Sequence, residues 1–323
     1  MTEERFKICT EKFGDYKTYK LCDSASGEYA SILPLMGGSI NGLAFKWNNE
    51  LVELIDGYKS FQEMQSNLTN SFKGSNLFPF PNRIANGTYS FLGKIYHLPV
   101  NFPTENSAIH GLVYDREFEV VKQENGPRSC SLSLRYYAAE CCQGYPYKYM
   151  LEQHYVLKED REFRCCTTIV NHSDCKIPVG HGWHPYFMMG PEKIDDLSLQ
   201  FPAATRLDMD QRNIPTGNSR PYGKFERRTK IGNTVLDHCF RFNESSEYVD
   251  IVLYNKKSDY GFKIRPETGR DKYNFVQIFT PYDRRSIAIE PMTCAPDAFN
   301  NKEGLIIMEP GESLSLTFFI FAI

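Results

Sequence analysis

Residues 180–187 of the chain, GHGWHPYF, place two histidines among two glycines and three aromatic side chains. Two glycines and a proline oppose a helix, so we expect an extended segment here. Successive side chains of a strand point to opposite faces, which separates His184 from His181 and Trp183. The glycines on the face of His184 predict open space that a ligand could fill. A structural, hydrogen-bonded histidine is the alternative, and this segment alone leaves both readings open.

A second candidate for chemistry is Glu290, in the stretch SIAIEPMTCAPDAFN at residues 286–300. Strand alternation directs Ile287 and Ile289 toward the core and leaves Glu290 on a face of small side chains. We expect Pro291 to end the strand ladder and to leave the carboxylate at a strand end. A glutamate placed in this way contributes little to stability, which favours a functional role.

Four further polar residues accompany these two: Asn82 and Arg83 after a proline-rich approach, His110 before Gly111, and Asp237 in an apolar run. The Arg83 guanidinium suits ligand oxygens and equally a carboxylate partner. Gly111 permits close approach of another group to His110. A buried Asp237 would need hydroxyl or arginine partners, whereas a surface turn would leave it structural.

Proton transfer on a neutral, polyhydroxylated ligand fits this set of side chains, because the chain carries neither a nucleophile motif nor a glycine-rich phosphate loop. A metal site at His181 and His184 is not expected, since the two rings would point apart on a strand. Glycoside hydrolysis normally needs two carboxylates flanking the bond, and only Glu290 stands out.

The elements that must position these residues are predicted to be strands, separated by turn signals. The one helical segment expected is Glu50–Met64, covering an edge or connecting strands. Without a fixed repeat or a linker, the simplest architecture is all-β: one large antiparallel sandwich formed by a single domain over residues 1–323. The strand-like runs are 131–137, 148–157, 162–170, 249–254, 274–280 and 313–323.

Composition narrows the class of partners and the compartment. The net charge of −3 offers no basic surplus for nucleic acid. The N-terminus carries no apolar run of signal-peptide length, and no segment approaches the roughly 18 apolar residues that cross a bilayer, so we expect a cytoplasmic protein without a membrane partner. The ten cysteines are irregularly spaced, with Cys141-Cys142 and Cys165-Cys166 adjacent and no C-x-x-C pair, which predicts free thiols.

Taken in order, the motifs resemble the aldose 1-epimerase (galactose mutarotase) family from about Gly37 to the C-terminus. The resemblance rests on PFPNRI-x-x-G-x-Y-x-F-x-G-x-x-Y-x-L, His110-Gly111, GWHPYF, Asp237, Ile289-Glu290-Pro291 with PDAFN at 296–300, and the closing ESLSLTFFIF. It implies a large β-sandwich with an open cleft across one sheet, which agrees with the strand pattern.

The resemblance also implies roles for the candidate residues. Glu290 would be the base that takes the proton of the anomeric hydroxyl, and His184 the acid that protonates the ring oxygen, with His110 assisting. Arg83 and Asp237, and more weakly Asn82, would hold sugar hydroxyls. The substrate would be a free aldohexose such as galactose or glucose, turned over without cofactor or metal by a monomer or homodimer.

Two other functions stay open at this point. A hexose-6-phosphate 1-epimerase would need cations at the cleft rim, for which Arg135, Arg164 and Arg206 are candidates beside Arg83. A carbohydrate-binding protein of the same fold would not turn its sugar over. Trp183 and Pro185, beside His184, depart from the commonest family form, which leaves the identity of the sugar open.

Overall fold

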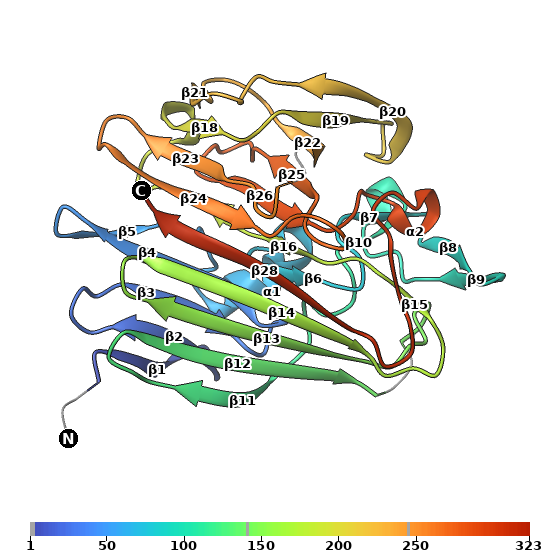
Figure 1. Cartoon of the computed structure of the whole chain (residues 1–323), viewed down its shortest axis with the longest axis horizontal. Helices are drawn as coiled ribbons and strands as arrows, with labels where there is room; N and C mark the ends of the chain where they lie inside the picture. The colour runs from blue at the N-terminus through green and yellow to red at the C-terminus, as the bar shows by residue number, and fades with distance from the viewer. Residues whose placement is uncertain (1–3, 140–141, 244–245) are drawn as a thin grey trace.

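The computed structural model describes residues 4–139, 142–243 and 246–323, and it has the predicted all-β architecture (Figure 1). All paired strands in the sheets described below are antiparallel. The largest sheet runs β11-β12-β13-β14-β28-β24-β23-β18-β21, and Figure 1 shows most of it edge to edge. In that order its strands are Glu119–Glu124, Ser129–Ala138, Tyr149–Lys158, Glu162–Asn171, Ser313–Ala322, Tyr260–Pro266, Ile251–Asn255, Ser198–Gln200 and Thr229–Lys230.

A second sheet of eight strands carries the candidate residues of the central and C-terminal parts of the chain. Its order is β20-β19-β22-β25-β26-β16-β6, and β17 also pairs with β26. The strands are Pro215–Tyr222, Ala204–Met209, Asp237–Phe242, Phe275–Phe279, Ile287–Met292, Gly182–His184 and Ser75–Leu77, with β17 at Tyr186–Phe187.

The remaining elements flank these two sheets. A five-stranded sheet runs from β1 to β5, and three two-stranded ladders join β10 to β7, β15 to β27 and β8 to β9. The bounds are β1 Phe6–Phe13, β2 Tyr16–Asp23, β3 Tyr29–Leu33, β4 Ser39–Trp47, β5 Glu50–Glu53, β7 Arg83–Ala85, β8 Thr88–Phe91, β9 Lys94–His97, β10 Ser107–Ile109, β15 Ile177–Val179 and β27 Ile306–Met308. Helices are α1 Phe61–Ser71 and α2 Ala298–Asn301, with 3₁₀ turns at Pro103–Glu105 and Ile194–Asp196.

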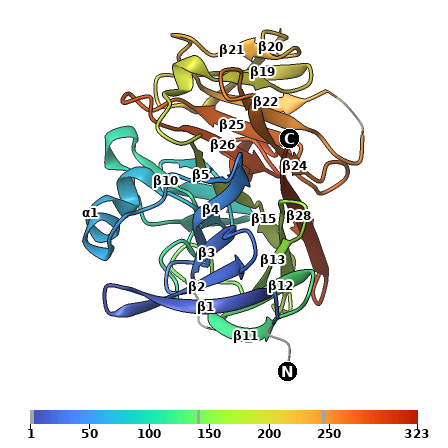
Figure 2. The ribbon, with the colours of Figure 1, turned by 90° about the vertical axis from the view of Figure 1, so that its left-hand side faces the viewer.

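The sandwich is held together by aromatic side chains that cross between its sheets. The Trp183 indole stacks on Phe318 of β28 with ring centroids 4.5 Å apart, and Phe187 packs on Phe262 of β24 at 5.1 Å. On the other half of the large sheet, β1 and β2 lie against β12 and β13 (Figure 2). These layers bury one extensive hydrophobic cluster, which leaves the opposite face of the eight-stranded sheet for a site.

The six strand-like runs of the sequence are confirmed, with ends that differ by at most two residues. The helix expected at Glu50–Met64 is wrong in its position. Glu50–Glu53 forms β5, because Asn48 and Asn49 adopt positive φ angles of 48° and 65° and turn the chain back on β4. The helix begins only at Phe61, where the Ser60 side chain caps Glu63 N at 3.1 Å.

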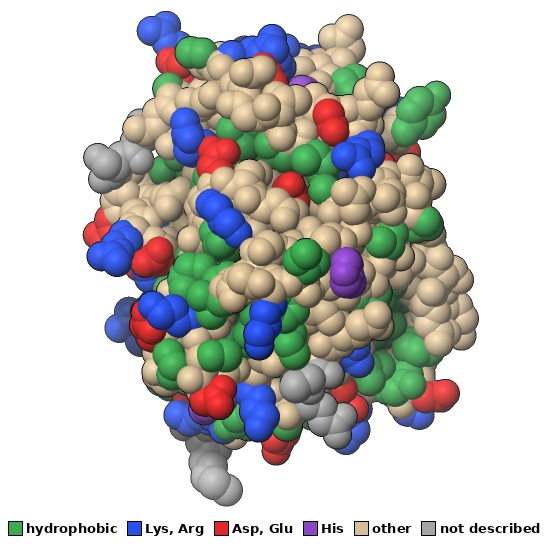
Figure 3. Space-filling view, turned by 90° about the vertical axis from the view of Figure 1, so that its right-hand side faces the viewer, with side chains coloured by type: hydrophobic (Ala, Val, Ile, Leu, Met, Phe, Trp, Pro, Cys, Tyr) green, Lys and Arg blue, Asp and Glu red, His purple; other side chains and the backbone are tan. Residues whose placement is uncertain are grey.

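None of the helices in the described part of the chain is long and apolar enough to cross a membrane. Lys, Arg, Asp and Glu side chains are interspersed on the face seen in Figure 3, without a large area of one sign. The nine cysteines within the described ranges are free thiols, as predicted, and Cys141 lies outside the described residues.

Candidate active site

His184 and Glu290 face each other across neighbouring strands. The pairs Gly182 with Met292 and Tyr186 with Ala288 share one register, which puts His184 opposite Glu290 although Pro185 interrupts the ladder between β16 and β17. Side chains directly opposite in an antiparallel pair lie on the same face. His184 Nε2 is accordingly 3.4 Å from Glu290 Oε1, and both side chains are more than nine-tenths buried.

The backbone around this pair differs from two expectations. Pro291 does not end β26, because it keeps its place opposite Val276 and only its amide donor is missing. The space beside Gly180 and Gly182 is filled by protein and is not open to a ligand. A Cβ at Gly180 would lie 2.5 Å from Cys294 Sγ, and one at Gly182 would lie 3.0 Å from Pro81. These glycines let other segments pack closely.

His110 reaches the same place from a strained loop. Its φ is +63°, a left-handed conformation that costs non-glycine residues about 1–3 kcal/mol and tends to occur at functional sites. The His110 amide donates to the Asn82 carbonyl at 2.8 Å, and Asn82 is itself left-handed with φ +55°. A Cβ on Gly111 would lie 2.2 Å from the Phe78 carbonyl oxygen, so the predicted close approach is that of the chain itself.

Aromatic rings hold the two imidazoles in place. The His110 and His184 rings meet edge to face with centroids 5.0 Å apart. Tyr186 stacks on His184 at 5.0 Å, and Phe72, at the end of α1, packs on His110 at 4.7 Å. Packing thus fixes both rings, and in the part of the chain that the structure describes their Nδ1 atoms are buried without a hydrogen-bond partner.

All six residues singled out in the sequence line one pocket of about 230 Å³. Pockets for drug-sized ligands span about 300–1,000 Å³, so this volume suits a smaller ligand such as one sugar ring. Within the described residues, Glu290 Oε2, Gln277 Oε1, His110 Nδ1 and His184 Nδ1 are buried without a hydrogen-bond partner. The lining consists of Asn70, Ser71, Phe72, Asn82, Arg83, Phe102, Glu105, Ile109, His110, His184, Tyr186, Asn213, Asp237, Gln277, Phe279 and Glu290.

Arg83 combines the two alternatives that its sequence context allowed, a carboxylate partner and a place in the pocket. Its Nε donates to Glu105, and its Nη1 donates to the Asn82 side chain at 3.0 Å. Asn213, in the turn between β19 and β20, also donates to Glu105, at 3.2 Å. This hydrogen bond holds the turn next to the Arg83–Glu105 pair. The guanidinium is thus oriented by protein contacts.

Asp237 lies two strands away from Glu290, and Gln277 stands between them. Gln277 is opposite Glu290 in the sheet, and its Nε2 donates to Asp237 Oδ1 at 2.7 Å. The surface-turn alternative for Asp237 is therefore wrong, because its carboxylate lines the pocket and has a buried amide partner. The three residues form a polar row along the floor of the pocket.

Burial controls protonation in this site. It raises the pKa of Glu290 well above the usual value of a glutamate, and the charge of Asp237 adds to the rise while that of Arg83 opposes it. Burial lowers the pKa of His184 to about 3. The pKa of His110 is also lowered, first by burial and then by His184 and Arg83. Burial thus disfavours the charged form of all three groups, a carboxylate at Glu290 and an imidazolium at either histidine.

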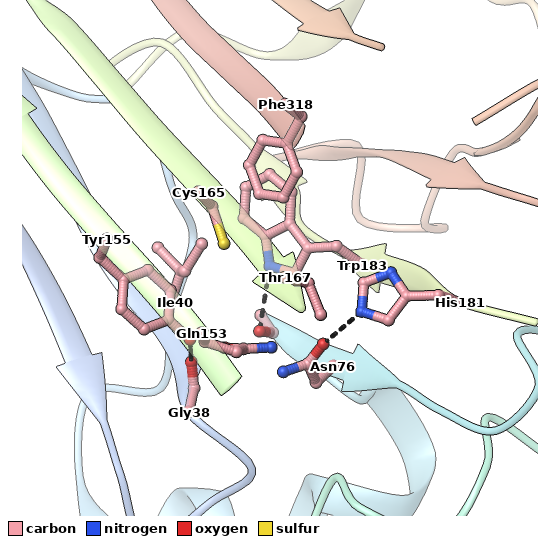
Figure 4. A pocket seen from close by; sticks show the side chains of 11 residues that line it. Gly38, Ile40, Asn76, Gln153, Tyr155, Cys165, Thr167, His181, Trp183 and Phe318 are labelled. Carbon is pink, nitrogen blue, oxygen red and sulfur yellow. Dashed lines mark hydrogen bonds between the residues drawn. The ribbon is translucent and has the colours of Figure 1, made fainter. Parts of the chain in front are cut away.

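His181 points away from this pocket, as the strand alternation predicted. Its Nε2 lies 2.8 Å from Asn76 Oδ1 and its Nδ1 lies 3.0 Å from the Tyr273 hydroxyl. Figure 4 shows His181 and Trp183 on the core side of β16, around a cavity of about 10 Å³, which is room for about one water molecule. His181 therefore has the structural role, and a metal held by His181 and His184 together is excluded by geometry.

A different set of side chains could hold a metal ion. One nitrogen from each of His110 and His184 and one oxygen of Glu290 all lie within 4.8 Å of one another, and all three residues are buried.

Sequence reasoning overlooked several lining residues. Gln277 had a detectable signal, since it is the one polar residue in the apolar strand Phe275–Phe279. Glu105 and Phe72 had none, because a loop glutamate and a phenylalanine at a helix end are unremarkable until the chain folds.

The arginines considered for a phosphate do not gather at this pocket. Arg135 pairs with Glu152 on β13 at 2.6 Å, and neither Arg135 nor Arg164 lines it. Arg206 lines a neighbouring hollow, where Asp208 lies 3.9 Å from its Nη2. Arg83 is the one arginine among the lining residues, against three carboxyl groups.

Comparison with known proteins gives the family. The sequence model of the family described as aldose 1-epimerase matches residues 19–320, nearly the whole chain. The chain belongs to the aldose 1-epimerase family. One relative is the uncharacterized protein YihR of Escherichia coli K12. It is 26% identical to this chain over 302 residues, which cover 92% of this chain and 91% of the relative.

Solved structures show the fold of the family. A galactose mutarotase-like protein from Clostridium acetobutylicum superposes with a TM-score of 0.86 at 21% identity, over 99% of both chains. Galactose 1-epimerase from Lactobacillus acidophilus superposes with a TM-score of 0.80 at 16% identity, again over 99% of each chain. The large antiparallel β-sandwich of the galactose mutarotase type is thus established for this aldose 1-epimerase family member.

Proposed function

We propose that the protein interconverts the α and β anomers of a free aldohexose such as galactose or glucose. The observation that carries the proposal is the 3.4 Å contact between His184 Nε2 and Glu290 Oε1 on the floor of a sugar-sized pocket. Membership in the aldose 1-epimerase family supports a sugar isomerase, and the geometry supplies a base and an acid for it.

The reaction consists of two balanced proton transfers. Glu290 takes the proton of the anomeric hydroxyl, the C1–O5 bond breaks as the C1 carbonyl forms, and O5 receives a proton from His184. Rotation about C1–C2 followed by the reverse steps closes the ring to the other anomer. The Glu290–His184 pair carries one proton, and burial favours that proton on Glu290. The proton therefore passes to His184 across the 3.4 Å contact when the sugar binds, and only then does Glu290 act as the base and His184 as the acid. Each well-placed group contributes roughly 10² to 10⁴ in rate. No cofactor is required by this chemistry.

The other residues hold the sugar in this proposal. Arg83, with its Nε and Nη1 already engaged, offers Nη2 to a hydroxyl, and Asp237 offers carboxylate oxygen beside Gln277. His110 assists at the ring oxygen or the anomeric centre, and Asn82 orients Arg83. Fixing one pose matters because a displacement of about 1 Å can cost about a hundredfold in rate.

The charge of the pocket favours a neutral sugar over a hexose 6-phosphate. Three carboxyl groups line it against one arginine, and that arginine is paired with Glu105. A phosphate dianion needs an excess of donors and positive charge. We further propose that a single domain over residues 1–323 works in the cytoplasm as a monomer or homodimer, without nucleic-acid or membrane partners.

Polarimetry with glucose, galactose and glucose 6-phosphate tests the proposal, on the wild type and on Glu290→Gln. We expect fast anomer exchange of a neutral hexose by the wild type and its loss in the variant, with sugar binding retained in calorimetry. A preference for the phosphorylated sugar would replace the substrate. Sugar binding without any rate in the wild type would indicate a carbohydrate-binding protein instead.

A further inference from the structure

We propose that His110, His184 and Glu290 also form a binding site for a divalent transition-metal ion, with Zn²⁺ as the best fit, and that the ion inhibits the enzyme. The inhibition, although not the binding, rests on the proposed function.

The donor set is the first argument. Two imidazoles and one carboxylate are the protein ligands of many three-ligand zinc sites, which keep a fourth position for water or substrate. Here the three side chains come from a loop before Gly111, from β16 and from β26, so they approach one point from different directions. Their fourth side is the pocket itself, from which an ion and a water molecule can enter.

Distances are the second argument. Ligand bonds of about 2.0–2.2 Å in a tetrahedron place ligand atoms about 3.3–3.6 Å apart. His184 Nε2 and Glu290 Oε1 already meet this separation at 3.4 Å. The full trio lies within 4.8 Å, so the remaining adjustment is about 1 Å of side-chain movement.

Unused donor atoms are the third argument. His110, His184 and Glu290 are 5%, 6% and 2% exposed, and within the part of the chain described, each has a buried polar atom without a partner. Buried polar groups normally have partners, so an unpartnered group in a pocket points to a ligand. The sugar is one such ligand, and an ion that accepts lone pairs from the same three groups is another.

Inhibition follows from the competition for these lone pairs. An ion held by His184 and Glu290 occupies the atoms that the proposed reaction uses to move protons. On His184, whose Nε2 faces Glu290, Nδ1 has no second-shell partner among the described residues, and such partners strengthen zinc sites by about 10- to 100-fold. We therefore expect reversible binding, weaker than that of a structural zinc site.

The test measures zinc binding and rate separately, using the Cys175→Ser protein to remove an exposed thiol. Calorimetry with ZnCl₂ should give one ion per chain, weakened about tenfold or more by His110→Ala and by the shape-conserving Glu290→Gln. His172→Ala, at an exposed histidine, is the matched control and should bind zinc like its parent.

Added ZnCl₂ should lower the mutarotation rate about tenfold or more, and EDTA should restore it. MgCl₂ should not lower the rate, because Mg²⁺ prefers oxygen ligands.

The outcomes separate this inference from the proposed function. Zinc that does not bind, or that binds equally well to the His110→Ala and Glu290→Gln variants when both are folded by circular dichroism, overturns the site. Zinc bound by the trio without any effect on the rate overturns the inhibition. A protein that binds zinc at the trio but turns over no sugar retains the metal site, and the proposed function is then wrong.

Discussion

His184 lies directly opposite Glu290 on adjacent antiparallel strands, with 3.4 Å between Nε2 and Oε1. The pair is buried on one side by the sheet and flanked by Tyr186, which stacks on the imidazole. Because both groups project from strands and not from mobile loops, their separation is set by the sheet itself. A proton donor and a proton acceptor held in this way need little reorganisation when a substrate binds.

Removing the carboxylate tests its role as base. Glu290→Gln keeps the shape of the side chain, and we expect kcat to fall by about 10²- to 10⁴-fold with little change in KM. Glu119→Gln, at an exposed position on β11, is the control and should match the wild type. Steady-state polarimetry measures both, and a wild-type kcat in Glu290→Gln would contradict the role.

Glu290→Gln, which should lower kcat, should raise the stability of the folded protein at alkaline pH. The pKa of Glu290 is raised in the folded protein, so its stabilising contribution is complete below the unfolded value near 4.5 and is lost as pH rises through the raised pKa. Gln does not titrate, so Glu290→Gln does not lose this contribution. We expect its free energy of unfolding at about pH 8 to exceed that of the wild type by about 1–3 kcal/mol. Thermal unfolding of both proteins at pH 5 and 8 provides the comparison, and a Tm difference that does not grow with pH would exclude this linkage.

The pH dependence of the rate follows from the two perturbed groups. The pKa of His184 is lowered to about 3, so the acid limb of kcat/KM should not appear at the usual histidine value near 6.5. The alkaline limb should appear where Glu290 loses the shared proton, above the usual range of a carboxyl group. Polarimetry from about pH 4.5 to 9, corrected for spontaneous mutarotation, gives the profile. An acid limb near 6.5 would indicate that the free enzyme keeps His184 solvated.

Arg83 should act on binding more than on chemistry. Arg83→Lys loses the planar fork that Glu105 and Asn82 orient, and we expect KM to rise about 10- to 100-fold with a smaller effect on kcat. Arg285→Lys, at a side chain that is 72% exposed, is the control. If Arg83→Lys lowered kcat and left KM unchanged, Arg83 would act in the transition state instead.

Gly111 and Gly311 have nearly the same φ angle but different surroundings. Substituting each by alanine therefore distinguishes the cost of a left-handed backbone from the cost of a steric clash. Gly111 has φ +77° with the Phe78 carbonyl oxygen 2.2 Å from a built Cβ, whereas Gly311 has φ +75° with nothing within 4 Å. Gly311→Ala should cost only the left-handed conformation, about 1–2 kcal/mol. Gly111→Ala should cost about 3 kcal/mol or more and should also reduce kcat, because His110 is displaced. Chemical denaturation measures the costs, and equal losses in both variants would remove the argument from crowding.

The sequence was most informative where a polar residue interrupts an apolar strand. Glu290 and Asp237 could be identified in this way, and Gln277 could have been. Side chains alternate between the two faces of a strand, so a polar residue within an apolar strand stands out. The helix is misplaced because Leu51 and Val52 fit the period of a helix as well as that of a strand. The turn at Asn48-Asn49, with its positive φ angles, decides for a hairpin. Glu105, Phe72 and the packing of Gly180 could not be found, since each depends on segments far away in the chain.

The ladder between β16 and β26 joins residues from the middle of the chain to residues near its end, with β25 and β22 beside them. A chain that ends before Glu290 lacks half of the proposed catalytic pair, and contacts between such distant segments form slowly. A nascent chain therefore stays inert on the ribosome until its last strands have emerged. In a refolding experiment, turnover should return together with the slowest kinetic phase, and an earlier return would show that the pair assembles before the sheet closes.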